Sequence, residues 1–248
     1  MCTLIILRRP NHVWPLLVAA NRDEMADRPS KAPARHWEDR HDVTAGLDVL
    51  AGGTWLGVND QRVVAAVLNR IGTLGPAPGK RSRGELPLEA LDHESAEAAM
   101  EALAHLEPNA YRTFNLVVAD PEKAYWLAND GKTIAVHAVP EGLHMITAFD
   151  MNSENSPRMR HFLPLFRTSD EPDPDLDDWR AWQALLTSRD RDPGTGEKGT
   201  MMVETSTGFG TVSSSLIAIP ARSRFEAKTR WLYCDDRPDM GDWAAVHL

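Results

Sequence analysis

The order of strand-like and helix-like segments constrains the fold of this chain more than any other feature. Apolar and β-branched runs bounded by turn residues predict strands, and apolar residues spaced three and four apart predict helices. The predicted strands cover residues 2–7, 16–20, 54–58, 62–68, 113–119, 124–128, 133–139, 143–148, 201–205, 211–219 and 225–233. Two helices are predicted between residues 82 and 107, and two more within residues 156–186. Strands separated by paired helices indicate an α+β fold, a four-layer αββα sandwich of two stacked antiparallel sheets. The length fits one large domain or two small ones, and we expect a single domain over residues 1–248.

Local signals mark the predicted helices. Ser82, with Glu85 three residues later, is typical of a capping box, in which each side chain caps the backbone N–H of the other residue. Ser156-Pro157 places proline at the first position of a helix, where its missing N–H is tolerated. The buried faces follow from the spacing of the apolar residues, which are Ala96, Ala99, Met100 and Leu103 in one helix and Met159, Phe162, Leu163 and Phe166 in another.

The charge and hydropathy of the chain argue against several classes of partner. The formal net charge is −9, whereas proteins that bind nucleic acid concentrate lysine and arginine. No run reaches the roughly 20 apolar residues of a membrane span. The apolar stretch after Met1 ends at Arg8-Arg9-Pro10, which is too short for a signal peptide. We therefore expect a cytoplasmic protein with neither a membrane span nor a nucleic-acid partner.

Cys2, directly behind Met1, is the strongest candidate for chemistry. Aminopeptidases remove an initiator methionine when the second residue is small, so the mature chain is expected to begin at Cys2. A thiol has a pKa of roughly 8.5 and an α-amine one of roughly 7.7–8.0, so the amine could take the thiol proton. The alternative is a small buried residue that only packs, as we expect of Cys234. No Cys or His spacing matches a zinc site, and no metal is expected.

Two polar clusters accompany Cys2. Residues 21–24, with the sequence Asn-Arg-Asp-Glu, follow a predicted strand and could form a site on a loop held by the sheet. They could equally be turn formers, with Arg22 and Glu24 as a surface ion pair. Lys80, Arg81 and Arg83 form a basic cluster in an acidic chain, which is either solvated or lines a pocket for an anionic ligand.

Several motifs together resemble the NRDE family, which includes the transport and Golgi organization protein 2 homologues. The matching segments span nearly the whole chain and are Met1-Cys2-Thr3-Leu4, Asn21-Arg22-Asp23-Glu24, Arg28-Pro29, residues 51–57, Leu68-Asn69-Arg70, Ser82-Arg83-Gly84, Phe114-Asn115-Leu116 and residues 210–214. That family is similar to the N-terminal nucleophile hydrolases, and most to the cysteine branch with choloylglycine hydrolase and penicillin V acylase. The resemblance implies the same αββα fold that the element order predicts.

The resemblance also implies roles for individual residues. Cys2 would be the nucleophile, Asp23 would hold the α-amine and Asn69 would donate to the oxyanion. Arg22 departs from the hydrolase pattern, in which an arginine precedes the aspartate by a few residues, but its positive charge would favour the thiolate. The residues expected to bind substrate are Asn21, Glu24, Arg28, Trp55, Arg70, Arg83 and Asn152. The position of Asn152 in the hydrolase pattern could instead belong to Asn155, and the last arginine of that pattern is not placed, although Arg222 and Arg224 lie nearby in order.

Two functions from different classes follow. The first is an amide hydrolase that acts through Cys2 on a small amide-containing or anionic ligand and requires no cofactor. The second, which the resemblance to the family implies, is a non-enzymatic haem-binding or haem-trafficking protein that uses the same pocket. Residues that could ligate haem iron are Cys2, His12, His36, His41 and several methionines, but the chain lacks a Cys-x-x-Cys-His attachment motif.

Overall fold

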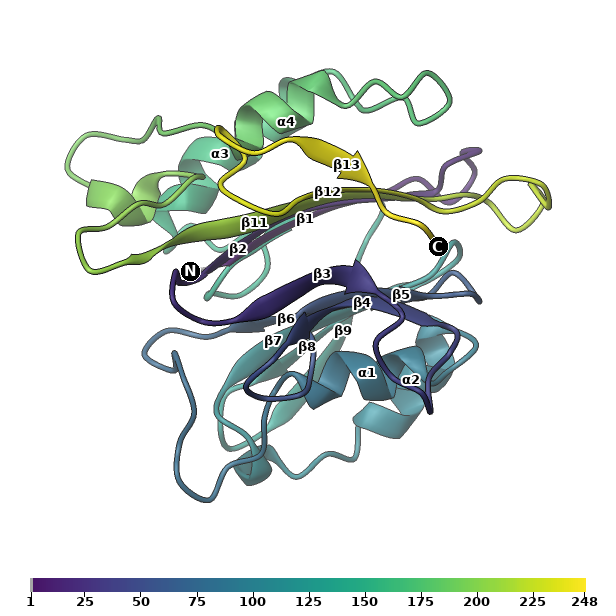
Figure 1. Ribbon diagram of the computed structural model, residues 1–248, viewed down its shortest axis with the longest axis horizontal. Helices are drawn as coiled ribbons and strands as arrows, with labels where there is room; N and C mark the ends of the chain where they lie inside the picture. Colours follow the sequence, from purple (N-terminus) through teal and green to yellow (C-terminus); the bar gives the residue numbers. More distant parts are fainter. Residues whose placement is uncertain (1) are drawn as a thin grey trace. The chain divides into compact units, whose positions relative to one another are not determined.

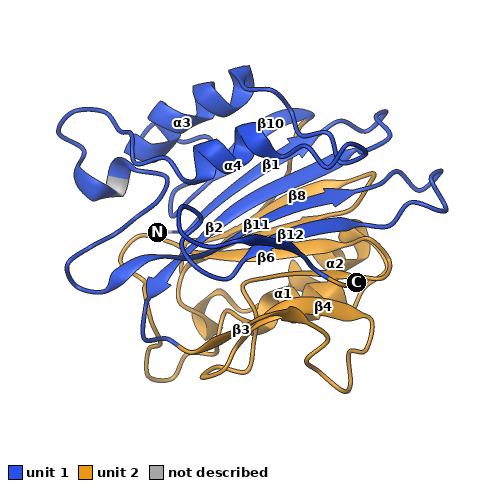
Figure 2. Ribbon diagram, turned by 45° about the horizontal axis from the view of Figure 1, so that its top comes forward, with its two compact units in different colours: residues 1–28, 141–246 blue, residues 29–140, 247–248 orange. Residues whose placement is uncertain are grey.

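The computed structural model describes residues 2–248, apart from the side chain of Lys198. The chain forms two compact units, which Figure 2 shows in different colours. Unit 1 contains residues up to Arg28 together with Glu141–Val246, and unit 2 contains Pro29–Pro140 with the last two residues. The single domain over residues 1–248 stays a prediction.

Unit 1 is built on a six-stranded antiparallel sheet with the order β10-β1-β2-β11-β12-β13. Its strands are β1 (Thr3–Arg8), β2 (Leu16–Met25), β10 (Gly142–Ile146), β11 (Phe209–Ile219), β12 (Arg230–Cys234) and β13 (Trp243–Ala245). β2 pairs with β1 on one side and β11 on the other, so that Asn21 lies opposite Thr3 and Asp23 opposite Thr211. Between Thr211 and Ser213 the register shifts by one residue, which makes Val212 a β-bulge.

Two helices, α3 (Pro157–Thr168) and α4 (Arg180–Leu186), cover one face of this sheet, as Figure 1 shows. The Ser156 hydroxyl accepts a hydrogen bond from the backbone N–H of Met159, so the predicted start of α3 is confirmed. The core between helices and sheet includes Ile5, Leu7, Leu17, Ala19, Met159, Phe162, Phe166, Trp179, Trp182 and Leu216. Because side chains alternate along a strand, the odd-numbered positions of β1 and β2 point toward the helices and the even-numbered ones away.

Unit 2 is built on a seven-stranded antiparallel sheet whose strands are neighbours in sequence order. They are β3 (Ser30–Ala34), β4 (Val43–Asp48), β5 (Leu56–Asn59), β6 (Val64–Asn69), β7 (Phe114–Ala119), β8 (Ala124–Asn129) and β9 (Ile134–Ala138). Helices α1 (Glu85–Leu91) and α2 (Ala96–Leu103) pack on one face, and the predicted buried face of α2 is confirmed. Short 3-10 helices occur at Pro108–Ala110 in this unit and at Gly196–Gly199 in unit 1.

Several predicted elements differ from the structure. The Ser82 hydroxyl accepts from the N–H of Gly84 within a turn and does not cap α1, so the capping box is wrong. The helix predicted from Leu176 begins at Arg180, because Asp173 and Asp178 exchange backbone hydrogen bonds around a turn. Residues 201–205 are not a strand, since only one isolated bridge joins this segment to β11. β3, β4 and β13 were not predicted.

Two of the family-like motifs meet at a pair of glycines in unit 2. Gly53 lies so close to Gly84 that a Cβ atom on Gly53 would stand 2.5 Å from the Gly84 carbonyl. The Thr54 N–H donates to that same carbonyl oxygen at 2.8 Å, which holds the two segments together. Only glycine fits at such a backbone approach.

We therefore expect Gly53→Ala to lower the free energy of unfolding by about 1–3 kcal/mol, because backbone atoms must move to admit the methyl group. Urea denaturation checks this. Gly84→Ala is the matched control, since its Cβ would meet backbone atoms at 3.2 Å and the cost should be smaller. Equal midpoints for Gly53→Ala and the parent protein would contradict the close approach.

Candidate functional site

Cys2 lies directly before β1, and its sulfur contacts the backbone of Asp23 on β2. The Sγ atom is 3.4 Å from the backbone nitrogen of Asp23, which donates to it, and 3.5 Å from the carbonyl oxygen of Asp23. The side chain is partly buried. The structure thus brings Cys2 and Asp23 together, but the contact runs through the Asp23 main chain.

The surroundings of Cys2 act on its pKa in both directions. Burial raises the pKa of the Cys2 thiol, and the negative charge of Asp23 raises it further. The hydrogen bond from the Asp23 backbone and the positive charge of Arg22 lower the pKa, but the net shift is upward. In this state Cys2 is a thiol at neutral pH, so a base is needed before the sulfur can act as a nucleophile.

The Asp23 carboxylate points toward the helices, as expected for an odd-numbered position of β2. Its Oδ2 accepts a hydrogen bond from Nη1 of Arg158 at 3.1 Å, and its Oδ1 accepts from the Thr211 hydroxyl at 2.7 Å. The same Nη1 of Arg158 donates to the Thr3 hydroxyl at 2.6 Å. Asp23 and Arg158 are both 1% exposed, so this is a fully buried ion pair directly behind the Cys2 contact.

Arg158 was not identified by the sequence analysis, although the sequence contains a signal for it. It belongs to the first turn of α3, one position before Met159 and four before Phe162. This position lies on the apolar face of the helix, and a charged residue there requires a buried partner of opposite charge. Asp23 supplies that charge.

Arg22 points to the face of the sheet that is not covered by α3 and α4. Opposite it on β11 is Ser213, and Tyr233 of β12 lies on the same face. Burial raises the pKa of Tyr233, whereas the neighbouring Ser213 hydroxyl and the charge of Arg22 lower it. The Tyr233 hydroxyl donates to Oδ1 of Asp235 at 3.1 Å. The charge of Arg22 also lowers the pKa of Cys2, so the same arginine acts on both the thiol and Tyr233. The sequence analysis did not identify Tyr233.

Asn21 has structural contacts at each polar atom of its side chain. Its Nδ2 donates to the carbonyl oxygens of Leu186 at 2.9 Å and Met201 at 3.2 Å, and its Oδ1 accepts from the Ser214 hydroxyl at 2.6 Å. These bonds connect β2 to the end of α4 and to β11. Substrate binding by Asn21 stays a prediction. To bind a substrate, the Asn21 side chain would have to give up one of these hydrogen bonds. The expected loop at residues 21–24 is wrong, since all four residues belong to β2.

The other predicted binding residues of unit 1 lie at the ends of strands. Glu24 lies near the end of β2, where its Oε2 is 3.9 Å from Nε of Arg28. The Asn152 side chain continues the edge of β10: its Oδ1 accepts from the N–H of Met145, and its Nδ2 is 2.8 Å from Nδ1 of His144. Asn155 is exposed, and its backbone N–H donates to the Ser153 hydroxyl. Of the two alternatives, Asn152 is therefore the one whose side chain is held by hydrogen bonds to neighbouring residues.

Asn69, Arg70, Trp55 and Arg83 belong to unit 2. Asn69 ends β6 opposite Phe114, while Nη1 of Arg70 donates to Oδ1 of Asn115 at 2.7 Å. Nε1 of Trp126 donates to that same oxygen at 3.1 Å. The indole ring of Trp55 fills the space where a side chain at residue 46 would stand, and Arg83 donates to the carbonyl oxygen of Thr113. Their roles in a site with Cys2 stay predictions.

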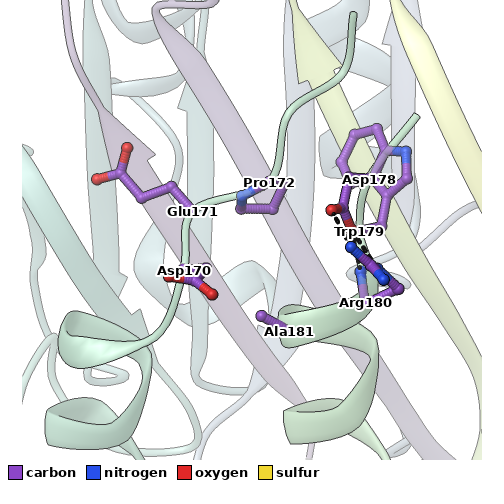
Figure 3. Close-up of a pocket in the computed structure, with 7 residues that line it drawn as sticks. All are labelled: Asp170, Glu171, Pro172, Asp178, Trp179, Arg180 and Ala181. Atoms are coloured by element: carbon purple, nitrogen blue, oxygen red, sulfur yellow. Dashed lines mark hydrogen bonds and ion pairs between the residues drawn. The ribbon is translucent and has the colours of Figure 1, made fainter. Parts of the chain in front are cut away.

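Two surface pockets occur in unit 1, and neither lining includes Cys2, Arg22 or Asp23. The first, about 330 Å³ in volume, is lined by Asp170, Glu171, Pro172, Asp178, Trp179, Arg180 and Ala181. Figure 3 shows that the Glu171 carboxylate points away from the others and that Arg180 pairs with Asp178. The second, about 470 Å³, is lined by Arg189, Asp190, Arg191, Glu197, Thr200, Met202 and Glu204.

The described residues contain no group of three or more His, Cys, Asp or Glu side chains that could hold a metal ion. The histidines proposed as haem ligands are dispersed: His12 belongs to unit 1, and His36 and His41 belong to unit 2. Nδ1 of His12 accepts from the N–H of Trp14, and Nε2 of His36 is 2.9 Å from the Ala32 carbonyl oxygen. Haem binding stays a prediction that no described contact favours. Within residues 2–248, no helix combines the length and apolar character of a membrane span.

Two solved structures have folds similar to that of this chain. An N-acylethanolamine-hydrolyzing acid amidase ortholog from Caenorhabditis elegans aligns with a TM-score of 0.56 and 14% identity, over 92% of this chain and 98% of that one. A mutant conjugated bile acid hydrolase from Clostridium perfringens aligns with a TM-score of 0.53 and 11% identity, over 100% and 97%. The fold, α+β with two antiparallel sheets, is that of the N-terminal nucleophile hydrolases, and the predicted fold class is confirmed.

The chain belongs to the Transport and Golgi organisation 2 family, whose model matches residues 1–232. This confirms the family that the motifs indicate. A Transport and Golgi organization 2 homolog from Mus musculus is 33% identical over 127 residues, which are 48% of this chain and 45% of that protein. The chain thus spans about half the length of the curated relatives that it matches.

Proposed function

We propose that this protein is an N-terminal cysteine hydrolase that acts on an amide bond of a small, anionic ligand. The observation that carries the proposal is the position of Cys2, whose sulfur lies against the Asp23 main chain immediately in front of the buried pair of Asp23 and Arg158. The likeness of the fold to amide-hydrolysing enzymes supports it. The positive charge of Arg22, which acts on the thiol, supports an anionic ligand.

The proposed reaction requires that Met1, which lies outside the described residues, is removed. The thiol proton passes to the new α-amine, and Sγ bonds to the amide carbonyl carbon. The C–N bond then breaks, and the leaving nitrogen takes a proton from the α-ammonium group. Water attacks the resulting thioester with the amine as base, which releases a carboxylic acid and restores the thiol.

In this reaction Asp23 and Arg158 would have a positioning role. Arg158 and Thr211 bind one carboxylate oxygen each, so the position of the carboxylate is fixed. An ionised carboxylate held in this way would favour the charged form of a nearby α-amine. The Asp23 N–H donates to the sulfur and would stabilise a thiolate as it forms. Asn69 remains the predicted donor to the oxyanion.

The state of the N-terminus tests the proposal directly. The intact mass of the purified protein should be short by one methionine residue. Alkylation of Cys2 by iodoacetamide, measured in a Cys234→Ser background, should show a lower midpoint pH in this trimmed form than in a form with an N-terminal extension. The extended form keeps the raised thiol pKa, whereas a new α-ammonium group beside the thiol lowers it. Retention of Met1 on every molecule, or equal midpoints, would overturn the proposal.

A further inference from the structure

The segment that connects β6 to α1 differs in charge from the rest of the chain. Residues 70–84 contain four basic residues, Arg70, Lys80, Arg81 and Arg83, and no Asp or Glu, although the whole chain has a formal net charge of −9. We call residues 70–84, the blue connection between β6 and α1 in Figure 1, the basic loop. Such a local concentration of positive charge favours an anionic partner.

The basic loop is held in place by arginine side chains. Arg112 lies two residues before β7. Its Nη1 donates to the carbonyl oxygen of Leu74 at 2.7 Å, and its Nη2 donates to that of Gly72 at 2.8 Å. Nη1 of Arg83 donates to the Thr73 hydroxyl at 3.0 Å. Carbonyl oxygens carry no net charge, so the bonds from Arg112 order the loop without neutralising the guanidinium group of this arginine. A loop ordered in advance loses less conformational entropy when it binds.

Two large apolar side chains stand out from this loop. Ile71 is 56% exposed and Leu74 is 45% exposed, and both belong to the stretch that Arg112 holds. The Lys80 ammonium group donates to the carbonyl oxygen of Asn109, again without neutralisation. Arg81 forms an ion pair with the carboxylate of Glu85 at 2.7 Å. The loop therefore presents apolar and cationic groups side by side.

We propose that the basic loop docks this protein onto the surface of an anionic lipid bilayer. A bilayer offers a partner for both kinds of side chain. Its acyl chains accept Ile71 and Leu74, and its acidic headgroups attract Lys80, Arg112 and their neighbours. A soluble anion such as free phosphate would engage the charges but leave the two apolar side chains in water. Interfacial binding of this kind combines buried apolar area with electrostatic attraction and does not require a membrane span.

Vesicle flotation tests this proposal on the full-length protein. We expect the protein to float with vesicles of phosphatidylcholine and phosphatidylserine, to remain at the bottom with phosphatidylcholine alone, and to be released by salt. Ile71→Ser/Leu74→Ser should weaken the partition coefficient about 10-fold or more through lost apolar burial. Lys80→Glu should weaken it about 5-fold or more, given about 1 kcal/mol per basic residue near the surface.

Matched variants in unit 1 control for general effects. Phe225→Ser removes an apolar side chain that is 86% exposed, and Lys228→Glu reverses an exposed charge, so both should bind vesicles like the parent protein. Thermal unfolding monitors whether each variant is folded. The proposal is overturned if the parent protein does not float with anionic vesicles, if the loop variants float as well as it does, or if the unit 1 variants lose binding equally. Competition by soluble phosphate that is clearly stronger than competition by salt of equal ionic strength would identify a phosphate site instead.

Discussion

Arg158→Ala is expected to lower the free energy of unfolding by about 3–5 kcal/mol, because it leaves the Asp23 carboxylate buried without its counter-charge. The same substitution removes the donor to the Thr3 hydroxyl at the start of β1. The ion pair and the hydrogen bond that are lost both lie directly behind Cys2, so the position of the N-terminal residues should change as well. Urea denaturation of the parent and the variant measures the effect.

Two further variants separate the charge pair from general damage to α3. Arg160→Ala changes an exposed arginine of the same helix and should cost less than about 1 kcal/mol. In the double variant Asp23→Ala/Arg158→Ala no buried charge is left unpaired, so its cost should fall below the sum of the two single variants. The buried pair would be contradicted if the losses of unfolding free energy in the two single variants summed to that of the double variant. A urea midpoint for Arg158→Ala equal to that of the parent protein would contradict it as well.

Cys2→Ala should reduce amide hydrolysis by about 1,000-fold or more, since the proposed nucleophile is absent. The variant should also lose covalent labelling by an acylating probe, with the label on the N-terminal peptide of the parent protein in mass spectrometry. A small side chain at residue 2 still permits removal of Met1. Cys2→Ala therefore removes the thiol without blocking the removal of Met1.

Cys234→Ser is the matched control for this prediction. Cys234 is buried in unit 1, and burial raises the pKa of its thiol, so it should contribute neither labelling nor activity. Hydrolysis by Cys2→Ala at the rate of the parent protein would rule out the proposed mechanism. If the probe labelled Cys234 in the Cys2→Ala variant, it would be reacting with any accessible thiol and would not identify a catalytic nucleophile.

The sequence predicted the parts of the fold that local patterns determine. The apolar face of α3 and its start at Ser156 follow from periodicity and from proline chemistry, both of which act over a few residues. β3 escaped prediction because its residues are polar or small, include Pro33, and are largely exposed, so no alternation of buried and exposed positions marks it. Its position in the sheet comes from pairing with β4, a contact that the sequence does not reveal.

The candidate site was predictable only in part for a similar reason. Cys2 and Asp23 stand out by position and motif, but their contact depends on the register of β1 against β2. Arg158 is 135 residues from Asp23 in sequence, and a charged residue on an apolar helix face indicates that a partner exists without indicating which one. The different directions of Arg22 and Asp23 follow from alternation along β2 once the strand is known to include them.

The β-bulge at Val212 has a consequence for how the site can evolve. Three hydroxyl groups from one short stretch of β11 serve three partners: Thr211 binds Asp23, Ser214 binds Asn21, and Ser213 lies with Arg22 and Tyr233 on the opposite face. The extra residue lets Thr211 and Ser213, two positions apart, face opposite sides of the sheet. The same few peptide units thus set the position of the buried ion pair and of the groups beside the thiol. Changes selected to suit a new ligand on one side will be constrained by packing on the other, so this stretch should vary slowly and as a block.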